Sequence, residues 1–264
     1  MIGSFLSVWT KLRRRALLLG VYGGSAAVAT LITAVVFANT LPTGGPRFGP
    51  TQGVPLAQLA GSGGLLAGLA SAATVLGVLA LSVAAGTLAG DHAGGTLRNL
   101  LIRQPRRLRL LAGEWLGLVT FSAGAVLVAA VAAGATAVAM SGSQGIDAGV
   151  WFTADGWQAT LRTLGEVVAA AVGYSTLGAA LGVLLRAPVA AVAVGFAWLL
   201  PLENILANTI DGAARWLPGQ LLSAIARDGT AQIALGTAVS TLAVYLSVAG
   251  VAAATVFARR DVTA

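Results

Sequence analysis

The chain has 264 residues, of which 57% are hydrophobic and 9% are charged, and its mean hydropathy is +0.86. A soluble domain carries about 25% charged residues. A chain this apolar cannot cover a water-exposed surface, so its solvent must be lipid. The absence of cysteine excludes disulfides, thiolate metal sites and cysteine nucleophiles. The net charge of +7 is a topology signal in such a protein, and we expect no nucleic-acid partner.

The composition favours helices over a β-barrel. Glycine is abundant, aromatic residues make up only 6%, and no stretch alternates polar and apolar residues at strand spacing. We therefore predict an all-α polytopic membrane protein with one transmembrane domain spanning 1–264. Small-xxx-small pairs are expected often by chance in so glycine-rich a chain, so they assign no helix interface. They occur at Gly20/Gly24, Gly64/Gly68, Gly113/Gly117 and Gly178/Gly182.

Residues 1–15 form a short amphipathic lead in which Lys11, Arg13, Arg14 and Arg15 follow apolar residues. Two interpretations remain open, an interfacial helix on the inner leaflet or a charged flank of the first span. In either case Lys11, Arg13 and Arg14 would anchor the chain at the inner leaflet. The apolar run that follows exceeds the ~7–15 residues of a signal-peptide core, so it is expected to be a retained span.

Six apolar runs are long enough to cross a bilayer, which requires about 20 helical residues. They cover about 16–38, 58–85, 110–140, 159–185, 189–206 and 231–257. Between the second and third lies a polar loop, 86–109, which contains five arginines. Residues 207–230 are half polar and half apolar, which predicts an outer re-entrant segment broken at Pro218-Gly219.

The distribution of cations predicts that both termini are cytoplasmic. This orientation places four cations of the lead, five of the 86–109 loop, Arg186 and two at the C-terminus inside. Only four are then outside or at outer span ends: Arg47, Arg162, Arg215 and Arg227.

The chain lacks the residues that an enzyme would need. It has a single histidine, His92, which excludes a HExxH zinc site, and a single lysine, Lys11, which is not in a P-loop. We expect no catalytic residue, no metal site and no cofactor in this chain. Any ATP that it uses must be hydrolysed by another protein. His92 itself, beside Asp91, is expected to be solvated or capping.

Charged residues within predicted spans are candidate functional sites. Arg162 and Glu166 are spaced i, i+4 and share a helix face, as a gate or as a local ion pair. Glu203 is expected to pair with Arg215 across the re-entrant segment. Glu114, near the inner end of the third span, is expected to pair with the loop arginines.

The 86–109 loop resembles the corresponding loop of ABC-2-type permeases, the membrane subunits of bacterial ABC exporters. That family has an acidic residue, then Gly-Thr-hydrophobic-Arg, then a Pro-containing basic segment leading into span three. Here Gly95-Thr96-Leu97-Arg98 and Pro105-Arg106-Arg107 stand in those positions, and Asp91 is the nearest acidic residue. The lead Trp9-Thr10-Lys11-Leu12-Arg13 is similar to the start of actinobacterial members, with Val8 where glutamate is common, and Trp216-Leu217-Pro218 is similar to the family's Leu-Pro element.

The resemblance implies a permease subunit in the plasma membrane that forms a homodimer or heterodimer and docks a separate ATPase, which binds ATP and magnesium. The loop would supply a coupling helix, with Arg106 and Arg107 as inner-leaflet anchors. Thr96 can cap a helix whose leucines share one face. The implied coupling residues are Asp91, Gly95, Thr96, Leu97, Arg98, Leu101 and Arg103.

Two other function classes remain open from the residues alone. One is a secondary transporter or channel that works without an ATPase, although few polar residues lie within the spans. The other is a non-transporting membrane anchor of a partner complex. No motif in the sequence identifies a substrate, although an apolar path favours lipid-like or drug-like cargo.

Overall fold

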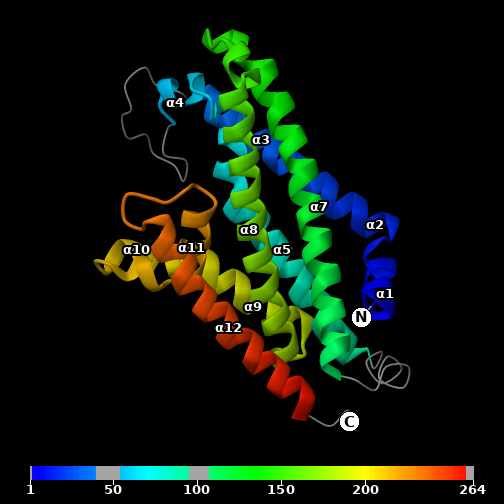
Figure 1. The fold of residues 1–264 in the computed structure, drawn as a ribbon. Helices are drawn as coiled ribbons and strands as arrows, with labels where there is room; N and C mark the ends of the chain where they lie inside the picture. Colours follow the sequence, from blue (N-terminus) through cyan, green and yellow to red (C-terminus); the bar gives the residue numbers. More distant parts are fainter. Residues whose placement is uncertain (1, 40–53, 95–106, 260–264) are drawn as a thin grey trace.

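The computed structural model describes residues 2–39, 54–94 and 107–259, and this part of the chain is helical (Figure 1). Six of its helical segments are long and apolar enough to cross a membrane. The prediction of an all-α polytopic membrane protein is therefore confirmed.

The candidate spans agree in number and order with the predicted runs, although their ends differ. They are Arg15–Ala38, Gly64–Ala93, Arg107–Gln144, Ala154–Leu185, Pro188–Thr209 and Leu235–Arg259.

Two of these spans contain a turn of π-helix. The first consists of α2 (Arg15–Leu18), a π-helical turn and α3 (Gly24–Ala38). The fifth consists of α9 (Pro188–Ala197), a π-helical turn that contains Pro201, and α10 (Glu203–Thr209). Pro201 lacks an N–H and cannot continue a regular α-helical ladder, which accounts for the irregular turn at this point.

The remaining spans are built on single long helices, and three shorter helices pack around them. The long helices are α5 (Ala67–Ala93), α7 (Arg107–Ser141), α8 (Ala154–Leu185) and α12 (Leu235–Arg259). The short ones are α1 (Ile2–Leu12), α4 (Leu56–Ala60) and α11 (Pro218–Ile225).

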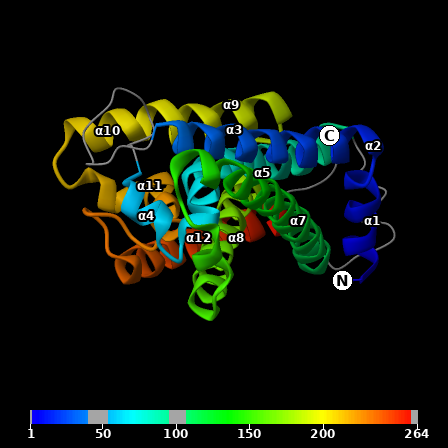
Figure 2. The same ribbon diagram turned by 90° about the horizontal axis from the view of Figure 1, so that it is seen from above.

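Helix α5 is the centre of the bundle (Figure 2), where it packs against α3, α8 and α9. Its contact with α8 is the most extensive between any two described helices. Glycines allow this close approach, because a Cβ on Gly178 would lie 2.3 Å from the carbonyl oxygen of Leu81. A Cβ on Gly77 would lie 2.1 Å from the ring of Tyr174. Small residues at helix contacts are the usual means of close packing within a bilayer.

The cation-rich parts of the chain gather at one end of the bundle. Helix α1, the end of α5, the start of α7 and the end of α12 lie at this end, and α4 and the α7–α8 turn lie at the other (Figure 1). We call these the inner and outer ends, since cytoplasmic loops carry the excess of arginine and lysine. Both described chain ends lie at the inner end, as an even number of spans requires.

The predicted re-entrant segment contains α11, which packs against α8 and α12. Leu221 and Leu222 of α11 are fully buried. Pro218 is the first residue of this helix, where its missing N–H costs no hydrogen bond. The segment is interrupted immediately before Pro218, between a 3-10 turn at Ala213–Trp216 and α11, which agrees with the predicted break at Pro218-Gly219.

Candidate functional site at the root of the loop

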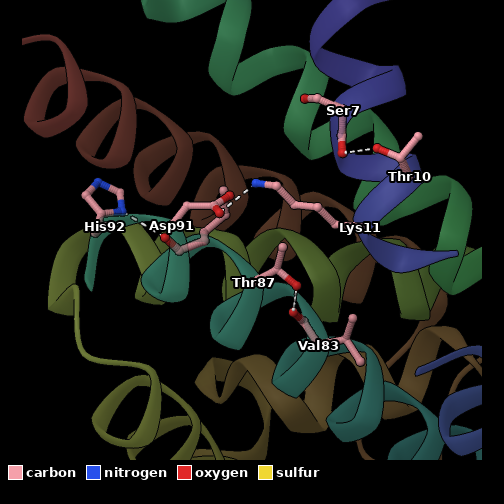
Figure 3. A network of polar contacts seen from close by, with 8 residues as sticks. Ser7, Thr10, Lys11, Val83, Thr87, Asp91 and His92 are labelled. Atoms are coloured by element: carbon pink, nitrogen blue, oxygen red, sulfur yellow. Dashed lines mark hydrogen bonds and ion pairs between the residues drawn. The ribbon is translucent and has the colours of Figure 1, made fainter. Parts of the chain in front are cut away.

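Helix α5 continues eight residues past the predicted end of the second span and stops at Ala93. Asp91 and His92 are therefore on a helix, and the prediction that places them in the polar loop is wrong. The Asp91 side chain is 8% exposed and accepts a hydrogen bond from Lys11 Nζ at 2.6 Å. Figure 3 shows Lys11 reaching from α1 to Asp91. This ion pair joins residues that are eighty positions apart.

Helix α1 is firmly packed on the bundle rather than a free flank. Val8 and Leu12 are buried, with exposed fractions of 0% and 1%. Val8 contacts α7 so closely that a Cβ on Gly117 would lie 3.1 Å from its side chain. The ring of Trp9 meets that of Phe121, on α7, edge to face. This packing supports a distinct amphipathic helix. It directs Lys11, a predicted lipid anchor, toward Asp91. The other two predicted anchors of the lead, Arg13 and Arg14, are exposed.

The end of α5 and the start of α7 also contact α12. Arg107, the first residue of α7, donates from Nη1 to the carbonyl oxygen of Ala258 at 3.2 Å. The His92 ring lies edge to face with Phe257, with ring centroids 6.0 Å apart. Its Nδ1 donates to the carbonyl oxygen of Leu88, one turn earlier on the same helix, at 2.8 Å. This bond holds the His92 ring against its own helix, and the expectation that His92 is solvated or capping stays a prediction.

The sequence does not predict the burial of Glu114, which also lies at the inner end. It is 0% exposed, and neither carboxyl oxygen has a hydrogen-bond partner among the described residues. Among the described residues, the charged groups that act on it are Asp91 and Lys11. The expected pairing with loop arginines is therefore not found for Arg107 and Arg109, which make no ion pair with Glu114. We use the term loop root for Lys11, Asp91, His92, Arg107 and Glu114.

The predicted coupling helix itself lies outside the described residues. The same holds for one of the four predicted arginine anchors. The residues concerned are Gly95, Thr96, Leu97, Arg98, Leu101, Arg103 and Arg106.

A second polar group lies at the outer end. Arg162 Nε donates to Glu166 at 3.0 Å, which confirms that these two residues form an ion pair on one face of α8. Arg162 also pairs through Nη2 with Asp228, which follows α11 and is 66 positions away in sequence. Glu166 and Asp228 line a polar cavity of about 570 Å³ together with Gln58 and Ser71.

Glu203 does not pair with Arg215, so that expectation is wrong. The carboxylate is 0% exposed and accepts hydrogen bonds from the backbone N–H groups of Gly219 and Gln220, at 3.1 and 3.0 Å. These are free donors of the first turn of α11. A carboxylate at a helix N-terminus satisfies both the donors and the helix dipole, so no arginine is needed.

The ion pair at the loop root gives a direct test of how α1 is held. Replacing Lys11 by methionine removes the ammonium group that pairs with the buried Asp91, and we expect a loss of about 1–3 kcal/mol in the stability of the docked state. A Lys11→Asp/Asp91→Lys exchange should recover a substantial part of that loss. Protease cleavage within α1 and thermal unfolding in detergent measure the two effects. If the exchange is as unstable as the sum of the single variants, the two residues do not interact.

The comparisons with known proteins give one family. No curated protein matches the chain. A family model described as "Protein of unknown function (DUF2705)" matches residues 28–263, from within the first span to beyond the last. Because this match covers well over half of the sequence, the chain belongs to the DUF2705 family.

Proposed function

We propose that this chain is the membrane-spanning permease subunit of an ABC-type exporter in the plasma membrane. The observation that carries the proposal is the contacts of the described residues on either side of 95–106. Asp91, before this stretch, bonds to α1, and Arg107, after it, bonds to α12. A partner that binds residues 95–106 and moves the end of α5 and the start of α7 would act on four helices at once, because α1 and α12 are bonded to α5 and α7.

The chemistry of the sequence supports the same proposal. The sequence has no P-loop, the motif that commonly holds ATP and magnesium in proteins that hydrolyse ATP. A separate ATPase subunit would supply both, docking on the Gly95–Arg98 stretch that resembles the coupling segment of ABC-2-type permeases.

The outer surface of the bundle suits an assembly and an apolar cargo. The most apolar windows of the fifth and sixth spans are only 22% and 17% buried, which leaves these helices free for lipid or for a second permease subunit. Between α7, α8 and α12 lies an apolar groove of about 420 Å³, lined by Leu111, Trp115 and Val183 among others. We therefore propose a homodimer or heterodimer of permeases with lipid-like or drug-like cargo.

The test is ATPase stimulation in proteoliposomes that contain this chain and a candidate ABC ATPase subunit purified separately. We expect Arg98→Glu to reduce the stimulation about tenfold or more, because it reverses the charge on the docking helix. Arg215→Glu makes the same change on an exposed arginine at the outer end and should keep the stimulation. Equal stimulation by wild type and Arg98→Glu would contradict the coupling role.

The alternatives predict different results from the same vesicles. Transport by this chain without the ATPase would favour a secondary transporter, for which the polar outer cavity is the supporting observation. Stable assembly with a partner but no transport under any condition would favour a membrane anchor.

A further inference from the structure

The groove between α7, α8 and α12 lies within one leaflet of the membrane, at the inner end of the bundle. Its volume of about 420 Å³ falls in the range of ~300–1,000 Å³ that is usual for small-molecule sites. Leu108, which is 55% exposed, and Trp115 are its first and last lining residues on α7. These seven residues of helix rise about 10 Å, roughly a third of the ~30 Å hydrocarbon core. The groove is therefore open to lipids of the leaflet at the inner end.

The lining of the groove presents an apolar surface. Its two polar side chains are bonded within the protein: Trp115 Nε1 donates to Thr176 Oγ1 at 2.9 Å, and Thr176 Oγ1 donates to the carbonyl oxygen of Val172 at 2.8 Å. The other lining residues are leucine, valine, alanine and glycine. The lining side chains thus have no hydrogen-bond donor left for a ligand, and the groove suits a hydrocarbon chain whose polar end lies outside it.

Each of the three helices that form the groove carries an arginine at its inner end. Arg107 begins α7, Arg259 ends α12, and Arg186 is the C-cap of α8. The bond from Arg107 to the Ala258 carbonyl oxygen joins α7 to α12 at this level. Arg186 and Arg259 are exposed and form no ion pair with another described residue. The inner mouth of the groove is therefore basic.

The acids of the neighbouring helices do not neutralise this mouth. Helix α12 contains no acidic residue, and the acids of α8 lie in its outer half. Glu114 on α7 is 0% exposed, and Asp91 on α5 is bonded to Lys11. A basic mouth above an apolar groove matches an anionic phospholipid, because basic pockets between transmembrane helices on the cytoplasmic side bind anionic headgroups.

A second copy of the chain fits this end of the bundle less well. A two-fold symmetric contact places the same patch of both copies face to face. The arginines at the mouth of the groove would then oppose each other, and like charges across an interface are costly. An anionic lipid neutralises the same arginines.

We propose that the groove between α7, α8 and α12 is a binding site for one anionic phospholipid, with an acyl chain along Trp115 and the phosphate held by Arg186 and Arg259. This inference goes beyond the proposed function, because the site binds lipid whether or not the chain works with an ATPase. The lipid completes the packing of α12, whose most apolar window is only 17% buried by the rest of the protein.

Trp115 provides a direct reporter, because bromine on a lipid chain quenches tryptophan fluorescence on contact. The full-length protein is placed in nanodiscs of phosphatidylcholine with a low fraction of brominated phosphatidylglycerol, or with the same fraction of brominated phosphatidylcholine. The Trp115 signal is the difference between wild type and Trp115→Phe. We expect the brominated phosphatidylglycerol to quench this signal at a severalfold lower fraction than the brominated phosphatidylcholine does.

Variants at the mouth test the headgroup contact. Arg186→Gln and Arg259→Gln should each reduce the preference for phosphatidylglycerol about fivefold, which corresponds to about 1 kcal/mol for an arginine near an anionic lipid. Arg215→Gln changes an exposed arginine at the outer end and should leave the preference as in wild type.

A pair of glycine variants on α12 tests the position of the acyl chain. Gly250 lines the groove and Gly236 does not, and a Cβ on either meets nothing within 4 Å. Both positions are exposed, so each leucine can be accommodated without moving the helix. Gly250→Leu fills the groove and should reduce the quenching of Trp115 at least severalfold, whereas Gly236→Leu should not change it.

Three results would overturn the proposal. One is equal quenching of Trp115 by the two brominated lipids. Another is a preference for phosphatidylglycerol that persists when Arg186 and Arg259 are both replaced by glutamine. The third is no quenching by either lipid together with a dimeric mass, which would show that a second copy covers the groove. Native mass spectrometry of the wild type, which should retain phosphatidylglycerol in preference to phosphatidylcholine, decides the question even if the variants do not fold.

Discussion

Replacing Gly178 with alanine is expected to separate α5 from α8 and to destabilise the bundle by about 1–3 kcal/mol. The new Cβ would lie 2.3 Å from the Leu81 carbonyl oxygen and 2.8 Å from its Cα. Both atoms belong to the backbone of α5, so no side chain can rotate to make room. The helices must move apart instead, which loosens neighbouring contacts such as that of Gly182 with Ala85. Overpacking of a close contact costs about 1–3 kcal/mol and occasionally more.

Gly165 provides a matched control on the same helix. It is exposed, and a Cβ built on it meets nothing within 4 Å. Gly165→Ala should therefore show only the gain in helix propensity, about 0.5–1 kcal/mol toward greater stability. Thermal unfolding in detergent, followed by circular dichroism, measures both variants. Equal stability of the two would show that α5 and α8 do not pack as closely as described.

The contrast between these two glycines shows what the sequence could not supply. Gly178/Gly182 was one of four small-xxx-small pairs with the same local pattern. In the structure Gly178 and Gly182 face the backbone of α5, whereas a Cβ on Gly20 or Gly24 would meet nothing within 4 Å. The sequence shows that a residue is small, but only the position of the neighbouring helix determines whether that residue allows a close helix contact.

The number and order of the spans could be predicted because hydropathy responds directly to the bilayer. The ends of the helices could not. Residues 86–93 are polar enough to mark the end of an apolar run, yet α5 continues through them to Ala93. The continuation is stabilised by Lys11, which neutralises Asp91 from a distant part of the chain. Hydropathy locates the edge of the membrane, whereas tertiary contacts determine where a helix stops.

Ion pairs within one helix could be predicted from the sequence, whereas ion pairs between distant elements could not. Arg162 and Glu166 were predictable as a pair because their spacing fixes their geometry on one helix. Asp228, the third member, comes from another element and left no local signal. The pairing of Lys11 with Asp91 was also invisible, since each residue taken alone fitted a common role at the membrane surface.

The sequence predicts the wrong partner for Glu203 because its actual partners are backbone N–H groups, which no residue type identifies. It accepts from two backbone amides, and any residue except proline has one. The nearest cation, Arg215, was the natural candidate when only side chains were considered. The only sequence signal was the Pro-Gly pair, which begins α11 and brings its amides close. A Cβ on Gly219 would lie 2.6 Å from Glu203 Oε2, so the glycine makes room for the carboxylate.

Removal of the Glu203 carboxylate is therefore expected to release α11 from the bundle. Glu203→Ala leaves the N–H groups of Gly219, buried, and Gln220, partly buried, without an acceptor. Each hydrogen bond to a charged group is worth about 1.5–3 kcal/mol. We expect a total loss of about 3–5 kcal/mol, with faster hydrogen exchange at Gly219 and Gln220. Glu203→Gln retains one acceptor oxygen and should lose about half as much.

The neighbouring Asn204 separates this effect from a general weakening of α10. Asn204 is exposed, and its side chain accepts a hydrogen bond from the Gln220 side chain at 3.4 Å. Asn204→Ala should therefore change stability by less than about 0.5 kcal/mol, as is usual at exposed sites. Hydrogen exchange at the two amides should remain slow in this variant. If exchange at Gly219 and Gln220 is as slow in Glu203→Ala as in Asn204→Ala, the carboxylate does not hold the start of α11. The order Ala, Gln, wild type in exchange rate would show that α11 is held by the number of acceptor oxygens that position 203 presents.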